Sequence, residues 1–223
     1  MTDFDFAISL EPENAMLYLH RGNVFSSLNR YDKALRDFEK AIELESNDYS
    51  LYYSAGTACY LQGNKLLGAP IINNNTNVTD KEIDRMADIY YEKALYYYSE
   101  AIKRSSDLYS LYADRGDAYL KLYQTSNAIK DFKEVIRLMP ASNTGYHGLG
   151  VAYSFDKEWE KALLYLSKSI SINSDYIESY IFRCGVYLEN NDIESARKDF
   201  DIVNKIDPND NRVLGIKKAY FIS

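Results

Sequence analysis

The sequence predicts an all-α fold in which pairs of antiparallel helices stack into a solenoid. Three observations support this prediction. Small residues recur with a period of 34, and a tyrosine recurs at one fixed point of that period. Each period also contains two short segments with the i, i+3, i+4, i+7 apolar spacing of amphipathic helices. One helix pair cannot bury its own apolar face, so neighbouring pairs have to stack on each other.

Two series of small residues define the period. The first series consists of Gly22, Gly56, Gly116, Gly150 and Cys184, and the second of Ala34, Ala94, Ala128, Ala162 and Ala196. A period of 34 fits both series if a single 26-residue insertion separates Gly56 from Ala94. The chain then contains five complete repeats, which span residues 15–48, 49–108, 109–142, 143–176 and 177–210.

Aromatic residues complete the repeat pattern. Position 4 of every repeat is a tyrosine, and position 24 is Phe38, Tyr98, Phe132, Leu166 and Phe200 in turn. With the proline at repeat ends, such as Pro140 and Pro208, the pattern resembles the tetratricopeptide repeat, W-x2-L-G-x2-Y, A-x3-F, P, with tyrosine in place of tryptophan. The resemblance covers essentially the whole chain. It implies a right-handed superhelical solenoid of helix pairs, with a concave surface lined by the first helix of each pair.

Residues 1–14 fit the end of the second helix of a partial repeat. Phe4, Ala7, Leu10 and Pro12 match positions 24, 27, 30 and 32 of the pattern. The first helix of this repeat is missing. Either the sequence is a fragment of a longer array, which we favour, or the first face is open and needs a partner. The second alternative predicts self-association through the open N-terminal face.

Repeats 1, 3 and 5 differ from repeats 2 and 4 at two linked positions. Position 7 is Arg21, Arg115 and Arg183 in the first group, and position 23 is Asp37, Asp131 and Asp199. Repeats 2 and 4 have Ala or Leu at position 7 and tyrosine at position 23. The two positions are equidistant from the turn between the helices, so their side chains should lie abreast. We therefore expect three structural Arg–Asp pairs rather than ligand-binding arginines.

The insertion falls within repeat 2, at about 64–89, between its two helices. The segment 68–78, GAPIINNNTNV, is typical of a loop. Thr79 and Glu82 then match a capping box. The second helix of repeat 2 should therefore start about three turns early and project roughly 16 Å beyond its neighbours. This projection is either a docking arm or a tolerated loop expansion, and we favour the second because long loops cost little free energy.

Residues 211–223 begin a sixth period but lack its small residues, so we expect a terminal capping helix there. The net charge of −7 disfavours nucleic acid as a partner. No run is apolar enough to be a signal peptide or a membrane helix, so we expect a cytoplasmic protein without membrane insertion. The two histidines and two cysteines form no catalytic or metal-binding pattern. We expect no enzymatic activity, no cofactor and no metal, with Cys59 and Cys184 as buried thiols.

The concave surface is the remaining candidate site. In the family that the pattern resembles, positions 2, 5, 6, 9, 12 and 13 of the first helices line it. The candidate groove residues are His20, Asn23, Tyr53, Thr57, Tyr60, Asp114, Asp117, Lys121, His147, Val151, Phe155, Ile181, Phe182 and Leu188. Aromatic side chains exposed here would suit a peptide or helix laid in the groove, whereas curvature of the solenoid could instead bury any one of them.

The function that we expect is that of a protein-interaction scaffold, whose protein or peptide ligand the sequence does not name. Apolar residues of repeats 3–5 would anchor the ligand, and Asp114 and Asp117 would favour a basic flank. The alternative is a targeting or regulatory module of a larger protein or enzyme. A carboxylate clamp of the chaperone-adaptor kind is disfavoured, because one of fifteen tested positions matches and Asp114 stands where an arginine is needed.

Overall fold

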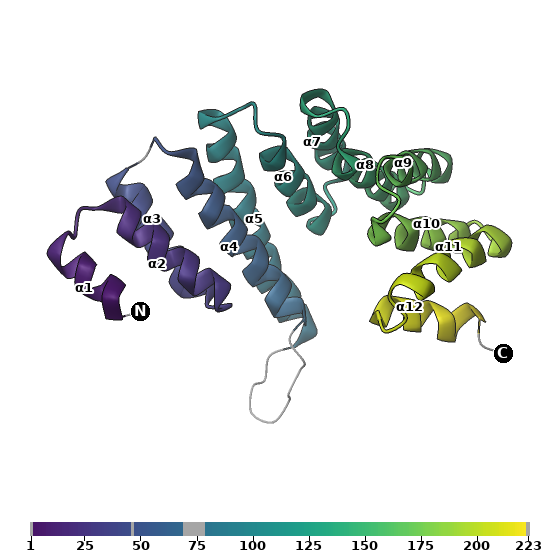
Figure 1. Cartoon of the computed structure of the whole chain (residues 1–223), viewed down its shortest axis with the longest axis horizontal. Coiled ribbons are helices and arrows are strands. Elements are labelled where there is room, and N and C mark those ends of the chain that lie inside the picture. The colour runs from purple at the N-terminus through teal and green to yellow at the C-terminus, as the bar shows by residue number, and fades with distance from the viewer. Residues whose placement is uncertain (1, 46, 69–78, 222–223) are drawn as a thin grey trace. The chain divides into compact units, whose positions relative to one another are not determined.

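The computed structural model describes residues 2–45, 47–68 and 79–221. These residues form helices connected by short turns, as the repeat pattern predicts, and the all-α fold of paired antiparallel helices is confirmed (Figure 1). The chain divides into two compact units, Met1–Leu122 and Tyr123–Ser223. We call these the first unit and the second unit.

The first unit contains the partial repeat, repeats 1 and 2, and the first helix of repeat 3. Its helices follow one another side by side (Figure 1). In chain order they are α1 (Thr2–Leu10), α2 (Ala15–Ser27), α3 (Tyr31–Leu44), α4 (Tyr49–Gly68), α5 (Asp80–Arg104) and α6 (Tyr109–Lys121).

The second unit contains the second helix of repeat 3, repeats 4 and 5, and the terminal helix. Its helices are α7 (Thr125–Leu138), α8 (Asn143–Phe155), α9 (Trp159–Ile172), α10 (Ile177–Glu189), α11 (Ile193–Ile206) and α12 (Asn211–Ile216). A π-helical turn, η1 (Lys217–Phe221), continues α12. Val213 of α12 is buried in the same apolar cluster as Phe200 and Val203 of α11, so α12 covers the end of repeat 5.

The recurring small residues lie where the two helices of a pair come closest. A Cβ added at Gly22 would lie 2.5 Å from the ring of Phe38, and one added at Gly150 would lie 2.5 Å from Leu166 Cγ. The alanines at position 20 have no exposed surface in any of the five repeats. Close packing at this seam therefore explains the glycine and alanine series, because a larger side chain would push the axes apart.

In four repeats the turn between the two helices lies at position 15, whereas repeat 2 has no turn there. At position 15 the backbone adopts the left-handed conformation, with φ of 55° to 58°, in Asn29, Tyr123, Lys157 and Asn191. Repeat 2 has Gly63 at this position, and α4 continues as a helix to Gly68.

The first residues of the predicted insertion, which starts at about residue 64, therefore belong to α4. Gly63 packs on the ring of Tyr91, where an added Cβ would lie 2.7 Å away, and the Tyr91 hydroxyl donates a hydrogen bond to Asn64 Oδ1 at 2.9 Å. These contacts with the elongated α5 extend α4.

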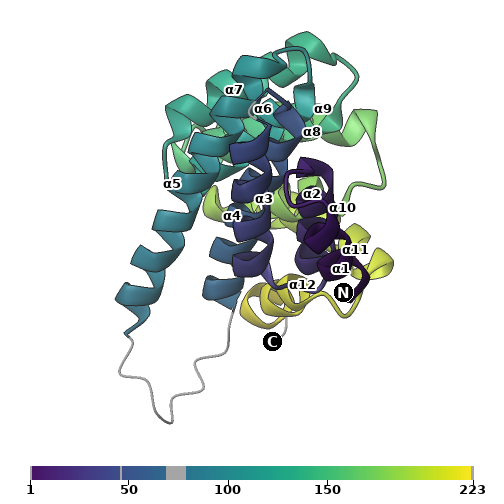
Figure 2. The same cartoon turned by 90° about the vertical axis from the view of Figure 1, so that its left-hand side faces the viewer.

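The early start of α5 is confirmed. Thr79 is its N-cap, and the backbone N–H groups of Thr79 and Glu82 each donate to the side chain of the other residue at 2.7 and 3.3 Å. The helix runs for 25 residues and extends well past the end of α6 in both views (Figures 1 and 2). The predicted loop lies outside the described residues, apart from Gly68.

Two of the three expected Arg–Asp pairs each lie inside a single unit, one in the first unit and one in the second, and both pairs are present. Arg21 donates from Nε and Nη2 to Asp37 at 2.8 and 2.7 Å, and Arg183 donates to Asp199 in the same way at 2.8 and 2.7 Å. In the third expected pair, Arg115 belongs to the first unit and Asp131 to the second. The Arg115 pair therefore stays a prediction.

The arginines also bind the preceding repeat, which the sequence analysis did not anticipate. Nη1 of Arg21 donates to Asp5 at 2.7 Å, that of Arg115 to Ser99 at 3.1 Å, and that of Arg183 to Ser167 at 2.9 Å. All three acceptors occupy position 25 of the repeat before. In repeats 1 and 5 one guanidinium thus ties a first helix to its own second helix and to the previous one.

Candidate functional site

The predicted groove residues of the first unit lie on α2, α4 and α6, and their exposed or partly exposed side chains are polar. His20, Asn23 and Lys121 are exposed. Tyr53, Thr57, Tyr60, Asp114 and Asp117 are only partly buried. Each of these residues lies on a first helix.

Tyrosine rings form the floor of this polar face. Tyr53 packs against Tyr98 of α5 with ring centroids 6.1 Å apart, and Tyr60 packs against Tyr91 at 5.7 Å. The Tyr98 hydroxyl donates a hydrogen bond to Thr57 Oγ1 at 3.4 Å. The tyrosines are therefore held in place by contacts within repeat 2 itself.

The two carboxylates on this face are incompletely solvated. Burial, the neighbouring Asp114 charge and a small opposing effect of Lys121 together raise the pKa of Asp117 to about 7. Burial also raises the pKa of Asp114, and a hydrogen bond from Tyr53 lowers it. Two carboxylates one turn apart on α6 therefore lack the solvation and the charge balance that would keep both ionised at neutral pH. A cation placed between them would supply that balance.

The second unit places one predicted groove residue in an internal hydrogen-bond chain. His147 of α8 lies 3.0 Å from Ser179 Oγ of α10, Ser179 donates to Ser169 Oγ at 2.8 Å, and Ser169 donates to the Asn143 carbonyl at 3.0 Å. Because the Ser179 proton is used toward Ser169, His147 Nδ1 is the donor to Ser179. Burial lowers the pKa of His147 to about 4, with Glu178 acting in the opposite direction.

The surroundings of His147 make it a structural residue. Its ring packs edge-on against Tyr176 and Phe182, with centroids 5.1 and 5.4 Å apart. Neutral imidazole suits this site, because burial would deprive an imidazolium of its hydration. His147 and its hydrogen-bond partners therefore join α8, α9 and α10, and the His147 ring packs against Phe182.

Three predicted groove residues are buried in the core of the second unit. Val151, Ile181 and Leu188 have 5%, 9% and 9% of their surfaces exposed. Leu188 packs in the cluster of α10, α11 and α12. The curvature of the helix stack buries these positions, which is the alternative that the sequence left open.

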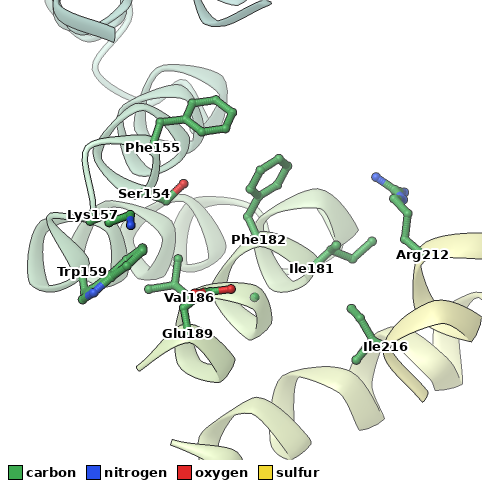
Figure 3. Close-up of a pocket in the computed structure, with 11 residues that line it drawn as sticks. Ser154, Phe155, Lys157, Trp159, Ile181, Phe182, Val186, Glu189, Arg212 and Ile216 are labelled. Atoms are coloured by element: carbon green, nitrogen blue, oxygen red, sulfur yellow. The ribbon is translucent and has the colours of Figure 1, made fainter. Parts of the chain in front are cut away.

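The second unit contains an apolar pocket of about 660 Å³. Phe155 and Trp159 come from the end of α8 and the start of α9, and α10 and α12 supply the remaining apolar walls (Figure 3). Of the predicted groove residues, the pocket brings together Phe155, Ile181 and Phe182. The full lining is Ser154, Phe155, Lys157, Trp159, Ile181, Phe182, Gly185, Val186, Glu189, Arg212 and Ile216.

The pocket exists because one position of repeat 5 has no side chain. A Cβ added at Gly185 would meet nothing within 4 Å. Gly185 occupies position 9, where the other four repeats have Asn23, Thr57, Asp117 and Val151. In repeat 5 the glycine therefore lies at position 9 instead of position 8. Cys184 takes the place of the glycine at the helix seam.

The rim of the pocket is charged. Arg212 donates to Glu178 at 2.5 and 3.0 Å and to Asp210 at 2.6 Å, and about half of its side chain is exposed. Lys157, in the left-handed turn between α8 and α9, is exposed, as is Glu189. Figure 3 shows Lys157 and Arg212 on opposite sides of the apolar lining.

Sequence reasoning named three of the lining residues as candidate groove residues, and Gly185 and Glu189 also occupy groove positions, 9 and 13. Trp159 was overlooked because it belongs to a second helix, and Arg212 and Ile216 because the terminal helix was treated as a cap. The signal that could have revealed the pocket is the Cys184–Gly185 pair, which breaks the glycine series by one position.

Within the described residues, no group of three or more His, Cys, Asp or Glu side chains is placed to hold a metal ion. Cys59 and Cys184 are free thiols and are buried, as expected, and burial raises the pKa of each. None of the described helices combines the length and the apolar character required to cross a membrane.

Comparison with known proteins identifies the repeats. Two family models described as tetratricopeptide repeat match residues 15–48 and 109–142. Hsp70-Hsp90 organizing protein 3 of Arabidopsis thaliana is 37% identical over 73 residues, which cover 33% of this chain and 13% of that protein. The Hsp70-Hsp90 organizing protein of Triticum aestivum is 26% identical over 164 residues, covering 71% of this chain and 23% of that protein. The chain therefore spans less than a quarter of the length of either relative.

Among solved structures, MamA from Desulfovibrio magneticus RS-1 is similar, with a TM-score of 0.68 and 19% identity over 88% of this chain and 97% of that one. At this identity the likeness shows the fold alone. The repeat matches, the period of 34 and the seam of small residues agree with one another. Residues 15–48 and 109–142 are tetratricopeptide repeats, and the fold of the chain is that of a tetratricopeptide repeat solenoid.

Proposed function

We propose that this chain is an interaction scaffold that holds an extended or helical segment of a partner protein on its concave surface. The pocket around Gly185 is the anchor site in this proposal, and the carboxylates of α6 favour basic residues elsewhere on the ligand. Proteins of this repeat family act as protein-interaction scaffolds, and the two plant relatives are named for organizing Hsp70 and Hsp90.

The single observation that carries the proposal is the pocket. Its volume of about 660 Å³ and its apolar and aromatic walls are typical of ligand sites, which combine such walls with a few polar groups. Phe155, which lines the pocket, is 45% exposed, and covering this apolar surface would be favourable because it removes the ring from water. A partner side chain inserted above Gly185 would bury Phe155, Trp159 and Ile216 together.

The surface of α6 supports a basic rather than an acidic partner residue. Asp114 and Asp117 lie beside Tyr53 and Tyr60, and the raised pKa of Asp117 reflects a site short of positive charge. A lysine or arginine side chain would keep both carboxylates ionised. Asp114 would also repel a C-terminal carboxylate, so the clamp used by some chaperone adaptors does not suit this face.

The relatives favour a second form of the same proposal. This chain covers 13% and 23% of the lengths of the two plant proteins. A module of this size could therefore act as the targeting or regulatory part of a larger protein, with the groove recruiting the substrate or the partner of the rest.

The experiment compares two glycine variants that differ only in their relation to the pocket. Gly185→Leu fills the pocket from its floor, whereas Gly215→Leu adds the same side chain on α12, outside the pocket lining. Neither added Cβ meets any atom within 4 Å, so both variants should fold. A random twelve-residue peptide library displayed on phage is selected on the wild-type chain, and the recovered peptides are titrated onto all three proteins.

We expect the selected peptides to bind the wild type and Gly215→Leu equally and Gly185→Leu at least about tenfold more weakly, since one large apolar side chain loses its site. Peptides that bind all three proteins with the same affinity would place the ligand outside the pocket. Circular dichroism of both variants establishes that the fold is retained.

A further inference from the structure

We propose that His147, held by a buried chain of hydrogen bonds, positions Phe182 in the wall of the pocket. The chain runs from the Asn143 carbonyl through Ser169 and Ser179 to the imidazole. His147 is then a positioning residue for the ligand site. The inference rests on the proposed function for the identity of that site, and it goes further by naming the residues that set the shape of the pocket.

The first argument is a paired change at the junction between repeats 4 and 5. At the earlier junctions, position 27 of one repeat and position 3 of the next carry apolar residues or glycine. Ala101 and Leu111 share one apolar cluster, and a Cβ added at Gly145 would lie 2.9 Å from Val135 Cγ1. Only between repeats 4 and 5 are both positions serine. The two serines therefore replace an apolar contact with a hydrogen bond.

The serine pair is completely buried, and its hydrogen bonds form a connected chain. Ser169 and Ser179 have no exposed surface, and Ser179 donates to Ser169 Oγ at 2.8 Å. Ser169 donates in turn to the Asn143 carbonyl at 3.0 Å. Buried hydroxyls add little net stability over an apolar contact, because they give up their hydrogen bonds with water. A satisfied polar chain instead fixes the orientation of its members.

The chain holds the imidazole of His147 in one tautomer and one orientation. Because the Ser179 proton is committed to Ser169, the proton of the neutral ring lies on Nδ1, 3.0 Å from Ser179 Oγ. The ring stands nearly perpendicular to those of Tyr176 and Phe182, with interplanar angles of 88° and 79°. Rotation of the imidazole would break its hydrogen bond to Ser179.

Phe182 connects this chain to the pocket. The Phe182 ring packs against His147 and also lines the pocket, beside Phe155 and Ile181 (Figure 3). Because Phe182 is only partly buried, fewer neighbours restrict its rotamer than in the core, and the ordered imidazole is one of them. An imidazole released from Ser179 would leave Phe182 free to adopt more than one orientation. A ligand would then have to order the ring on binding.

Fluorine NMR of Phe182 tests the proposal without any ligand. Phe182 alone is replaced by 4-fluorophenylalanine, and its resonance is recorded in the otherwise unchanged chain and in Ser169→Ala/Ser179→Ala. The double variant leaves every aromatic ring in place and removes both hydroxyls together. Ser179→Ala alone is used if the double variant does not fold. Ser171→Ala is the matched control, because this exposed serine of α9 donates to the Lys168 carbonyl of its own helix.

We expect the Phe182 resonance of the double variant and of Ser179→Ala to broaden, or to shift toward its value in the urea-unfolded chain. The physical reason is that the ring then samples more than one orientation. Ser171→Ala should leave the resonance unchanged, and circular dichroism establishes that each variant is folded. An unchanged resonance in a folded serine variant overturns the proposal. If the urea midpoint falls in that case, the chain is a structural element alone.

The phage-selected peptides give a second measurement. We expect those that Gly185→Leu weakens to bind the double serine variant about three- to tenfold more weakly than the wild type or Ser171→Ala, because the ligand has to order one more side chain. Equal affinities for these peptides would overturn the link between the chain and the ligand site. If the selection recovers no peptide that depends on Gly185, the proposed function is refuted. The fluorine resonance still decides, by itself, whether the chain positions Phe182.

Discussion

The two units of the molecule are built on the same seam and differ on the concave face. In both, small residues let paired helices touch, and an Arg–Asp pair joins them, Arg21 with Asp37 in one and Arg183 with Asp199 in the other. The concave face is polar in the first unit, with Asp114 and Asp117 beside tyrosines, and contains an apolar pocket in the second.

The difference shows which positions of the repeat are free to vary. Position 8 packs against the second helix and is Gly or Cys throughout, whereas position 9 faces the groove and ranges over five residue types. Seam positions are constrained by close contact, and groove positions are constrained only by a ligand. Residues that determine function in this chain are therefore expected at position 9, one residue after the glycines of position 8.

The largest expected effect tests whether the seam is indeed the same in both units. Arg21→Leu and Arg183→Leu should each lower the free energy of unfolding by about 3 kcal/mol, because each leaves a largely buried aspartate without its partner. Adding Asp37→Tyr or Asp199→Tyr converts the repeat to the apolar type of repeats 2 and 4 and should recover much of the loss. Double variants no more stable than the single ones, measured by urea denaturation, would contradict this account of the seam.

The next effect is a pH dependence confined to the second unit. The pKa of His147 is lowered to about 4 in the folded chain from its ordinary value of 6.5, so folding favours neutral imidazole. Stability from this residue is complete above pH 6.5 and is lost as pH falls toward 4, by at most about 3 kcal/mol. His147→Gln should remove this part of the pH dependence of urea denaturation. The same slope in wild type and variant would refute the assignment.

The first unit should show the opposite dependence through Asp117. Because its folded pKa is raised to about 7, the contribution of Asp117 to stability decreases as pH rises from about 4 to 7. Asp117→Asn should therefore stabilise the chain at pH 8, by about 1 to 2 kcal/mol after allowance for its partial exposure. Thermal denaturation at pH 5 and pH 8 measures the change. A variant less stable than wild type at pH 8 would mean that the carboxylate has a compensating partner.

The smallest effect separates the seam from the pocket. Gly185→Ala should raise the free energy of unfolding by about 0.5 to 1 kcal/mol, because alanine is the better helix former and nothing stands in its way. Gly150→Ala, whose Cβ would lie 2.5 Å from Leu166 Cγ, should lower it despite the same helix propensity. Equal signs for the two variants in urea denaturation would remove the distinction between the two faces.

The helix pairs could be predicted from the sequence alone, because periodic local contacts set their spacing. Gly22 against Phe38 and Arg183 against Asp199 recur at fixed intervals, and a fixed interval can be found in one chain. The capping box at Thr79 is equally local. The extension of α4 was missed, because it depends on Tyr91 packing on Gly63, two residues separated by the insertion.

The candidate site was predictable only in part. Repeat positions identified Phe155 and Phe182 as groove residues, but burial of Val151 and Leu188 depends on how neighbouring helices close over them. The pocket required residues from the start of α9 and from α12, which the position rule for first helices does not include. A cavity is set by which side chains are absent, and sequence patterns record mainly those that are present.

Acrylamide quenching of the single tryptophan, Trp159, tests most directly the claim that the missing side chain at Gly185 opens a pocket in a scaffold that does not need it filled. We expect Trp159 emission to be readily quenched in the wild type and in Gly215→Leu, and to be protected in Gly185→Leu with the unfolding free energy maintained. Equal quenching in all three proteins, or a loss of stability specific to Gly185→Leu, would contradict it.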